Sequence, residues 1–361
     1  MRAWYHVSPH EPCRICDKPD WCSFSADGAW ALCRRIDTGG GLHRVDKAGV
    51  DYWLYHLGGQ LTSRRPTVEL PASPKAECAD PLTLDLAYRT LLTALPLSSM
   101  HRQALRQRGL PAVEILRRRY RTLPLHGRIA LARLVVDRCG PDTCARVPGL
   151  CIHTQGTRRW WTLADAPGLL IPVRNIDNRI VALKVRADSS GEGPRYTYLS
   201  SRRHDGPGPG APVHVPLHAF SFEAPVRLTE GELKADVTTV LSGVLTIAVP
   251  GVSVWRQALP LLHGLQPKEV LLAIDSDWRT NAHVAQALGQ AAVALVKEGY
   301  EVQVEDWEPA LGKGVDDLLA AGHTPVRQSL ALAFGAALRG QTRTRTGRLP
   351  AIAAEEVPPW R

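Results

Sequence analysis

Three acidic motifs in the C-terminal part of the chain have the residue types and the placement to bind a metal ion. Each follows an apolar run that predicts a β-strand. In chain order they are Glu230, Asp275 with Asp277, and Asp316 with Asp317. The carboxyl ends of parallel strands lie at one edge of a sheet, where ligands collect. Carboxylates that meet there stay ionised only beside a cation, and hard oxygen ligands select Mg²⁺ or Mn²⁺.

The spacing within the motifs supports a shared metal site. Asp275 and Asp277 are two residues apart, so their side chains point the same way at the end of a strand. Gly231 allows a tight turn beside Glu230. Acids that follow strands also cap helix N-termini, and for any single motif capping is the better explanation. Three motifs in succession, each after its own strand, favour the metal site.

Predicted strands and helices alternate from residue 220 onward and would position these acids. The strands are at 226–229, 244–249, 269–274 and 301–304, and the helices are at 232–242, 253–262 and 283–298. This alternation is typical of the α/β class, in which a parallel sheet is covered by its crossover helices. We therefore expect the three motifs to come together at one edge of a parallel sheet.

A second set of candidate ligands lies near the N-terminus. Four of the eight cysteines of the chain are Cys13, Cys16, Cys22 and Cys33. The first two form a Cys-x2-Cys pair, and four thiolates fit the tetrahedral coordination of Zn²⁺. Buried free thiols are the alternative, and His10 and His43 are spare ligands. We expect a structural zinc site, because a segment this short could not easily fold without a staple.

A basic segment lies between the two sets. Residues 101–121 hold seven arginines against one acid, and the chain has a formal net charge of +9. Strand-like runs follow at 168–175, 179–185 and 195–199, with a hairpin turn between the first two. In the second run Lys184 and Arg186 alternate with apolar residues, which predicts a basic face. Such a charge excess suggests a polyanionic partner, of which nucleic acid is the commonest.

Four tryptophans allow two interpretations. Trp160 and Trp161 could form a base-stacking platform, but a core anchor beside a surface neighbour is the commoner role of such a pair. Trp21 and Trp30 could also stack on bases. We expect both of them in the core of the cysteine-rich segment instead.

These patterns predict five parts of the chain. They are a zinc-binding domain at 1–62, a linker at 63–80, a basic subdomain at 81–219, a catalytic α/β domain at 220–338 and a flexible tail at 339–361. We find no apolar N-terminal signal segment and no run of about 18 apolar residues, so we expect a soluble, cytoplasmic protein. No GxxxxGK[ST] motif occurs, so helicase activity is not expected of this chain.

The acidic motifs resemble a known family. A Glu-Gly after one strand and Asp-x-Asp after a third is similar to the Toprim domain of primases, topoisomerases and related nucleases. The stretches AVPGVSVW and GKGVDDLL are similar to primase motifs. The whole set most resembles Toprim primases of mobile elements, relatives of the bacterial DnaG-type enzyme. TEGELKAD departs from the bacterial pattern, in which an Asp often stands at the position of Lys234.

This resemblance implies a DNA primase, which joins ribonucleoside triphosphates into a primer on single-stranded DNA. Glu230, Asp275 and Asp277 would hold catalytic Mg²⁺ or Mn²⁺, and Asp316 and Asp317 would complete the outer metal shell. The residues implied to face template and nucleotide are Arg174, Lys184, Arg186, Arg195 and Tyr196. The zinc domain would contact template DNA, and a replicative helicase from another chain is the implied partner.

Two rival functions remain open on the sequence. A Toprim nuclease would use the same metal site to cut DNA, although the basic subdomain and its hairpin argue against it. A recombination mediator of the RecR kind also combines a four-cysteine zinc site with a Toprim domain, but such proteins are much shorter. A topoisomerase is disfavoured because it would require a much larger chain.

Overall fold

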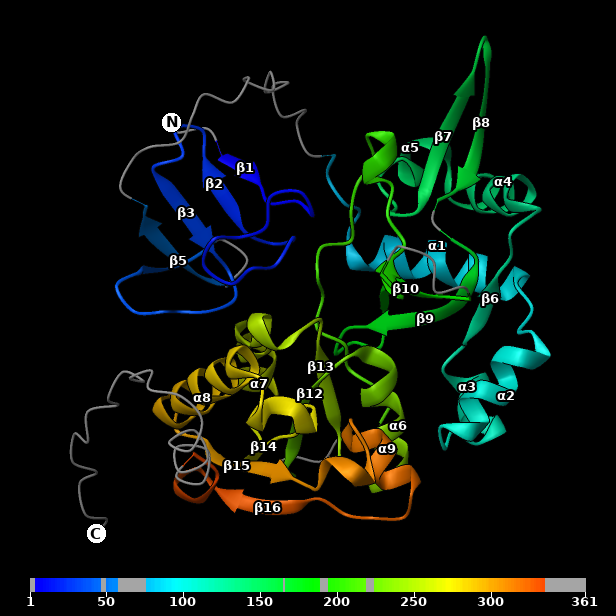
Figure 1. The fold of residues 1–361 in the computed structure, drawn as a ribbon. Coiled ribbons are helices and arrows are strands. Elements are labelled where there is room, and N and C mark those ends of the chain that lie inside the picture. Colours follow the sequence, from blue (N-terminus) through cyan, green and yellow to red (C-terminus); the bar gives the residue numbers. More distant parts are fainter. Residues whose placement is uncertain are drawn as a thin grey trace. The chain divides into compact units, whose positions relative to one another are not determined.

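The computed structural model describes residues 4–46, 50–57, 76–164, 166–188, 194–218 and 224–334. The chain divides into two compact units (Figure 1), of which the first comprises Met1–Ser63 with Ser329–Arg361 and the second Arg64–Gln328. The predicted tail 339–361 and most of the predicted linker 63–80 lie outside the described residues. Within the part of the chain that is described, no helix has the length and apolar character needed to cross a membrane.

The first unit is built on an antiparallel sheet of short strands in the order β1-β2-β3-β5-β4. The strands are β1 (Trp4–His6), β2 (Ser23–Ser25), β3 (Trp30–Cys33), β4 (Leu42–Val45) and β5 (Asp51–His56). Its core is small: three cysteines are buried together with Val7, Phe24, Ala31, Trp53 and Tyr55. A core of this size supplies little hydrophobic stabilisation, so the cysteines are central to how this unit stays folded.

The second unit opens with five helices, in a part that we call the basic subdomain (residues 76–218). They are α1 (Pro81–Ala94), α2 (Ser99–Gln107), α3 (Ala112–Arg117), α4 (Arg128–Cys139) and α5 (Pro141–Cys144). The start of α1 is set locally. Asp80 accepts hydrogen bonds from the backbone N–H groups of Leu82 and Thr83 at 3.0 and 3.1 Å, and Pro81 stands at the first helical position, where its fixed φ suits the helix.

An antiparallel sheet packs on these helices in the order β11-β10-β9-β6. Its strands are β6 (Arg121–Leu123), β9 (Gly168–Arg174), β10 (Ile180–Ala187) and β11 (Tyr196–Tyr198). The predicted hairpin is present, and Asn178 adopts φ +60° in its turn, a conformation that Asn tolerates better than most residues. The strand β9 is buried along its whole length, because α1 contributes to the core on one side and helix α6 (Glu232–Ser242) packs on the other.

A separate two-stranded ribbon rises from the basic subdomain. Its strands are β7 (Leu150–Gln155) and β8 (Arg158–Leu163), which pair with each other in antiparallel register. Figure 1 shows the ribbon extending away from the helices around its base. The ribbon was not predicted as a paired element, although the two tryptophans on β8 were singled out.

The rest of the second unit, which we call the α/β subdomain (residues 224–328), has the predicted alternation. Its sheet has the order β13-β12-β14-β15-β16, and the pairs β12–β13, β12–β14 and β14–β15 are parallel. The strands are β12 (Val226–Glu230), β13 (Thr246–Val249), β14 (Glu269–Leu272), β15 (Glu301–Asp306) and β16 (Val326–Ser329). The α-helices are α6, α7 (Leu259–Leu265), α8 (Ala282–Lys297) and α9 (Val315–Ala320), and the 3-10 helices are η2 (Val252–Ala258), η3 (Ser276–Arg279) and η4 (Pro309–Leu311).

Three details of this subdomain differ from the prediction. The helix expected at 253–262 is the 3-10 helix η2 followed by α7, whose early Pro260 lacks the N–H that a continuous helix would use. The third acidic motif does not end a strand: Asp316 and Asp317 lie in the first turn of α9, after η4. The edge strand β16 was missed, because its residues are mostly polar and exposed.

Candidate functional site

The four cysteines of the first unit come together as a candidate metal centre. Among the described residues they are the one group of three or more potential ligands whose donor atoms all lie within 4.8 Å of one another. The Sγ atoms of Cys16 and Cys22 are 3.7 Å apart, and those of Cys22 and Cys33 are 4.0 Å apart. Four sulfur atoms at such spacing can hold a tetrahedral Zn²⁺ ion.

The backbone around the first pair is shaped as a tight turn. The N–H of Asp17 donates to the carbonyl of Cys13 at 2.7 Å, and the N–H of Cys13 donates to the carbonyl of Lys18 at 2.9 Å. Asp17 adopts φ +56° to close the turn, which Asp tolerates because its short side chain costs little there. Cys33 reaches the cluster from the end of β3, so the sheet and the turn together position the sulfurs.

The thiols already share charge within this cluster. Hydrogen bonds from Cys22 and Cys33 lower the pKa of Cys13 to about 2, while its contact with Cys13 raises the pKa of Cys22. The sulfurs therefore interact strongly with one another, as ligands that share one site do.

The two spare ligands, His10 and His43, are not part of the group that the four cysteines form. His43 contacts Asp51, with 2.6 Å between its Nε2 and a carboxylate oxygen. The prediction that Trp21 belongs to the core is wrong: its exposed fraction is 52%, and the guanidinium of Arg35 lies 5.3 Å from the centre of its ring. Trp30 is half-buried against His56, and Trp53 is the tryptophan that the core contains.

In the α/β subdomain, Glu230 ends strand β12, which pairs with β13 and β14, at the carboxyl edge of the sheet. One of its carboxylate oxygens accepts the backbone N–H of Val252 at 3.1 Å, so the turn after β13 faces the strand end. Gly231 follows with φ +88°, a conformation that favours glycine. Burial raises the pKa of Glu230, and the charge of Asp275 adds to that increase. Glu230 and Asp275 are therefore electrostatic neighbours.

Asp275 and Asp277 follow the adjacent strand β14, and two lysines neutralise them. Lys234 of α6 donates to one carboxylate oxygen of Asp275. The ammonium of Lys313 lies 3.5 Å from the other oxygen of Asp275 and 3.7 Å from Asp277. Asp275 raises the pKa of Lys313. The exposed fractions of the two lysine side chains are 14% for Lys234 and 69% for Lys313, so Lys234 is the enclosed partner.

Lys234 reaches this position because Gly314 leaves room for it. A Cβ on Gly314 would overlap Asp316 Oδ1 and would stand 2.9 Å from Lys234 Cε. Asp316 is buried, and one of its oxygens forms an ion pair with Arg108, which caps the C-terminus of α2. Its other oxygen is buried and has no hydrogen-bond partner among the described residues. That oxygen lies on the side where Lys234 passes toward Asp275.

The five predicted acids therefore share one region but do not have equal surroundings. The carboxylates of Glu230, Asp275 and Asp277 form no group as tight as the cysteines, since the lysines lie among them. Asp317 accepts the backbone N–H of Gly314 at 3.2 Å, which is the helix-capping role considered as the alternative for a single motif. The donors are still of the kind that a hard divalent cation takes, because all are carboxylate oxygens and one oxygen of Asp316 is buried without a hydrogen-bond partner among the described residues.

Two of the five residues implied to face template and nucleotide are buried instead. Arg174 is 2% exposed and donates to the backbone carbonyl of Arg118 at 3.1 Å, and burial lowers its pKa to about 10. Lys184 is 8% exposed and pairs with Glu232 at 2.7 Å. Lys184 therefore does not face solvent as expected, because helix α6 covers it and provides Glu232 as its partner.

The remaining three predicted contacts lie further toward the surface. Arg186 is half-buried, Arg195 is exposed, and Tyr196 is 38% exposed. Neighbouring Tyr198 is enclosed and donates its hydroxyl to Glu232 at 2.7 Å, and burial raises its pKa. Of the five predicted residues, these three are the ones that a polyanion could reach from solvent.

A buried charge network joins the two subdomains. Arg118 donates to Asp236 at 2.9 Å, and Tyr120 donates its hydroxyl to the other oxygen of that carboxylate. Although burial opposes ionisation, His214 and Arg118 lower the pKa of Asp236 to about 2. Apolar residues of both subdomains pack around the network; they are Leu105, Leu110, Ile115, Tyr120, Leu169, Ile171, Leu233 and Val237. The basic subdomain and the carboxylate edge are therefore parts of one packed body.

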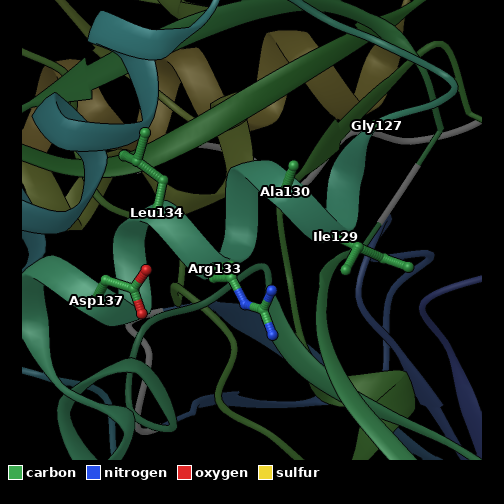
Figure 2. A pocket seen from close by; sticks show the side chains of 6 residues that line it. All are labelled: Gly127, Ile129, Ala130, Arg133, Leu134 and Asp137. Atoms are coloured by element: carbon green, nitrogen blue, oxygen red, sulfur yellow. The ribbon is translucent and has the colours of Figure 1, made fainter.

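A hollow of about 590 Å³ lies elsewhere, on the exposed side of helix α4. Figure 2 shows the side chains that line it, which are Gly127, Ile129, Ala130, Arg133, Leu134 and Asp137. It includes none of the predicted ligands. We therefore place the candidate chemistry at the carboxylate edge and the cysteine cluster.

The arrangement defines a mixed α/β protein with a four-cysteine centre and an acidic sheet edge. Residues 219–325 match the model of a family described as a domain of unknown function, DUF3854. No curated protein matches the chain in sequence. Solved structures that resemble it are DnaG-type primases.

One of these structures is the Aquifex aeolicus primase, with its zinc-binding and RNA polymerase domains. Its TM-score is 0.52 at 14% identity, and the match covers 73% of this chain and 66% of that one. Others are a DnaG primase catalytic domain bound to single-stranded DNA (TM-score 0.49, 18% identity, 72% of this chain and 78% of that one) and the E. coli primase catalytic core (TM-score 0.49, 16% identity, 72% and 84%). The Aquifex match shows that the chain shares the fold of primase zinc-binding and RNA polymerase domains.

Proposed function

We propose that this chain is a DNA primase of the DnaG type, whose α/β subdomain is a Toprim domain that transfers nucleotides to a growing RNA primer. The observation that carries the proposal is the carboxylate edge of Glu230, Asp275 and Asp277, on a fold shared with the Aquifex primase. The basic subdomain packed against the α/β subdomain supplies positive charge for a template and a triphosphate, both of which bring many negative charges.

In this proposal Asp275 and Asp277 hold Mg²⁺ or Mn²⁺ together with Glu230, and the buried oxygen of Asp316 supports them. When bound, the ion activates the primer 3′-hydroxyl and neutralises the triphosphate. The chain's own residues prepare the site. The N–H of Val252 orients the Glu230 carboxylate, and the ammonium of Lys313 lies beside the carboxylates of Asp275 and Asp277.

Arg186, Arg195 and Tyr196 are the proposed contacts to template or nucleotide, since all three reach solvent beside the paired strands β10 and β11. Arg174 and Lys184 have a different proposed role. Both side chains already interact with residues inside the fold, so they stabilise the hairpin and its junction with α6. The zinc-binding unit, with Cys13, Cys16, Cys22 and Cys33 around Zn²⁺, is the proposed template-binding accessory.

The test is primer synthesis on single-stranded DNA with labelled ribonucleoside triphosphates and magnesium. We expect wild-type protein to make products longer than a dinucleotide, and Asp275→Ala to make them about a thousandfold more slowly, because charge neutralisation at the reacting phosphate is lost. Asp137→Ala, an exposed acid on α4, is the matched control and should retain wild-type activity. Absence of product from the wild type, or equal activity of Asp275→Ala, would refute the proposal, and shortened template would indicate the nuclease.

A further inference from the structure

The β7–β8 ribbon has exposed residues for which the fold has no evident use. The stretch from Leu150 to Leu163 contains two arginines, a histidine and two tryptophans, but no Asp or Glu. Its tip, from Ile152 to Arg159, is exposed throughout. Within the part of the chain that the structure describes, Arg158 and Arg159 have no ion-pair partner. An isolated two-stranded ribbon is at best marginally stable in water, so this one depends on the anchoring of its base.

The base of the ribbon is firmly anchored. Leu150, Cys151 and Leu163 are buried, and Arg128 of α4 donates to the carbonyls of Leu163 and Ala164 at 3.4 and 3.3 Å. Trp161 packs against the core of the basic subdomain. The ribbon is therefore a protruding element with a fixed base, as Figure 1 shows.

The pairing register separates the two faces of the ribbon. His153 pairs with Trp160, and Gln155 pairs with Arg158. Because residues directly opposite each other share a face and residues two apart along a strand do so too, these four lie on one face, with rungs about 7 Å apart. The rings of His153 and Trp160 lie 4.9 Å apart, centre to centre. Arg159 is on the opposite face, with Trp161.

We propose that the His153–Trp160–Arg158 face binds single-stranded DNA, an inference that rests on the proposed function and adds a binding surface remote from the carboxylate edge in sequence. A base stacks on the aromatic rung, and the guanidinium of Arg158 on the next rung takes the adjacent phosphate. Aromatic stacking beside positive charge is how proteins hold unpaired strands without reading their sequence. In a duplex the faces of the bases are covered by their neighbours, so the aromatic rung fits an unpaired strand.

Two arginines on opposite faces provide a matched pair of variants. Binding is measured by fluorescence anisotropy of a labelled oligothymidylate of about 20 nucleotides, with full-length zinc-bound protein and no magnesium. We expect Arg158→Ala to weaken binding about tenfold and to reduce the slope of log K against log salt by about 0.7, the value for one phosphate contact. Arg159→Ala, equal in charge change but on the other face, should stay within about threefold of wild type.

The aromatic rung is tested separately. Trp160→Ala should weaken binding by about five- to a hundredfold and leave the salt slope unchanged, because stacking releases no counterions. Trp160→Phe retains a ring and should recover most of the affinity, which keeps the test sound if the alanine variant is unstable. A duplex of the same length should be insensitive to Trp160→Ala.

The inference is overturned if Arg158→Ala and Trp160→Ala both bind like Arg159→Ala, if Trp160→Phe loses as much affinity as Trp160→Ala, or if duplex binding suffers as much as single-strand binding. Primer synthesis by the same proteins separates this result from the proposed function. If the wild type makes primers and the ribbon variants bind DNA as tightly as the wild type, only the proposed role of the ribbon is refuted. If the wild type makes no primers but the variants show the expected changes in binding, the primase proposal is refuted and the binding role of the ribbon stands.

Discussion

The cysteine cluster and the carboxylate edge are both candidate metal centres, but they are prepared in different ways. The donor atoms of the four cysteines all lie within 4.8 Å of one another. The carboxylates of Asp275 and Asp277 have Lys234 and Lys313 beside them instead. One centre is assembled by its own ligands, whereas the other is balanced by cations that belong to the chain.

The cause of this difference is the charge of the free ligands. Thiols are neutral when protonated, so four of them can pack closely inside a small core. Carboxylates are ionised at neutral pH and repel one another, so a cluster of them needs positive charge before any metal arrives. The lysines supply that charge, and a divalent ion must compete with them. We therefore expect the loss of a cysteine to weaken metal binding at the first centre. The loss of a lysine should strengthen metal binding at the second.

The largest expected effect is at the cysteine cluster. Cys22→Ser should eliminate bound zinc and unfold the first unit, because structural zinc contributes on the order of 10 kcal/mol to such small domains. Metal analysis and circular dichroism measure the two consequences. Cys139→Ser, a thiol of α4 outside the cluster, should keep the zinc. A Cys22→Ser protein that still holds zinc would mean that the cluster does not need all four sulfurs.

A smaller effect of opposite sign is expected at the enclosed lysine. Lys234→Gln should strengthen Mn²⁺ binding about tenfold, since it removes the ammonium that competes for Asp275 in a site of reduced dielectric constant. Titration followed by electron paramagnetic resonance measures the affinity. The same variant should melt at a lower temperature without metal and recover when Mn²⁺ is added. Weaker Mn²⁺ binding would show that Lys234 positions the carboxylates rather than competing for them.

The smallest effect is expected at Lys313. Its side chain is 69% exposed, so solvent and salt screen its attraction to Asp275 and Asp277. Lys313→Gln should strengthen Mn²⁺ binding by about two- to threefold, in the same titration and most clearly at low salt. Lys268→Gln, a similarly exposed lysine, provides the baseline. If the Lys313 and Lys234 variants gain the same Mn²⁺ affinity, burial of the lysine does not determine how strongly it competes with the metal.

Local signals in the sequence predicted much of the fold. Helix α6 was predicted with its observed bounds, Glu232–Ser242, because Gly231 and Gly243 flank a run that contains neither Gly nor Pro. The hairpin β9–β10 and the parallel order of elements followed from apolar periodicity and turn residues. The polar edge strand β16 was missed because its four residues carry no such pattern.

The surroundings of the site could not be predicted, since they depend on contacts between distant residues. Lys234 meets Asp275 across 41 positions of the chain, and Lys184 meets Glu232 across 48. Alternation along β10 indicates that Lys184 and Leu183 face opposite ways, but it does not reveal which face another helix covers. The cysteine cluster was easier to predict, because its members lie close in sequence.

Helix α6 has a consequence for how this protein can evolve. Its two faces serve different neighbours: Lys234 points to the carboxylate edge, while Glu232 and Asp236 pair with Lys184 and Arg118 of the basic subdomain. Loss of one partner of a buried pair leaves an uncompensated charge, at a cost of about 3–5 kcal/mol. We therefore expect a substitution at either member of such a pair to be tolerated only when its partner is substituted too. Helix α6 and the basic subdomain would then evolve together.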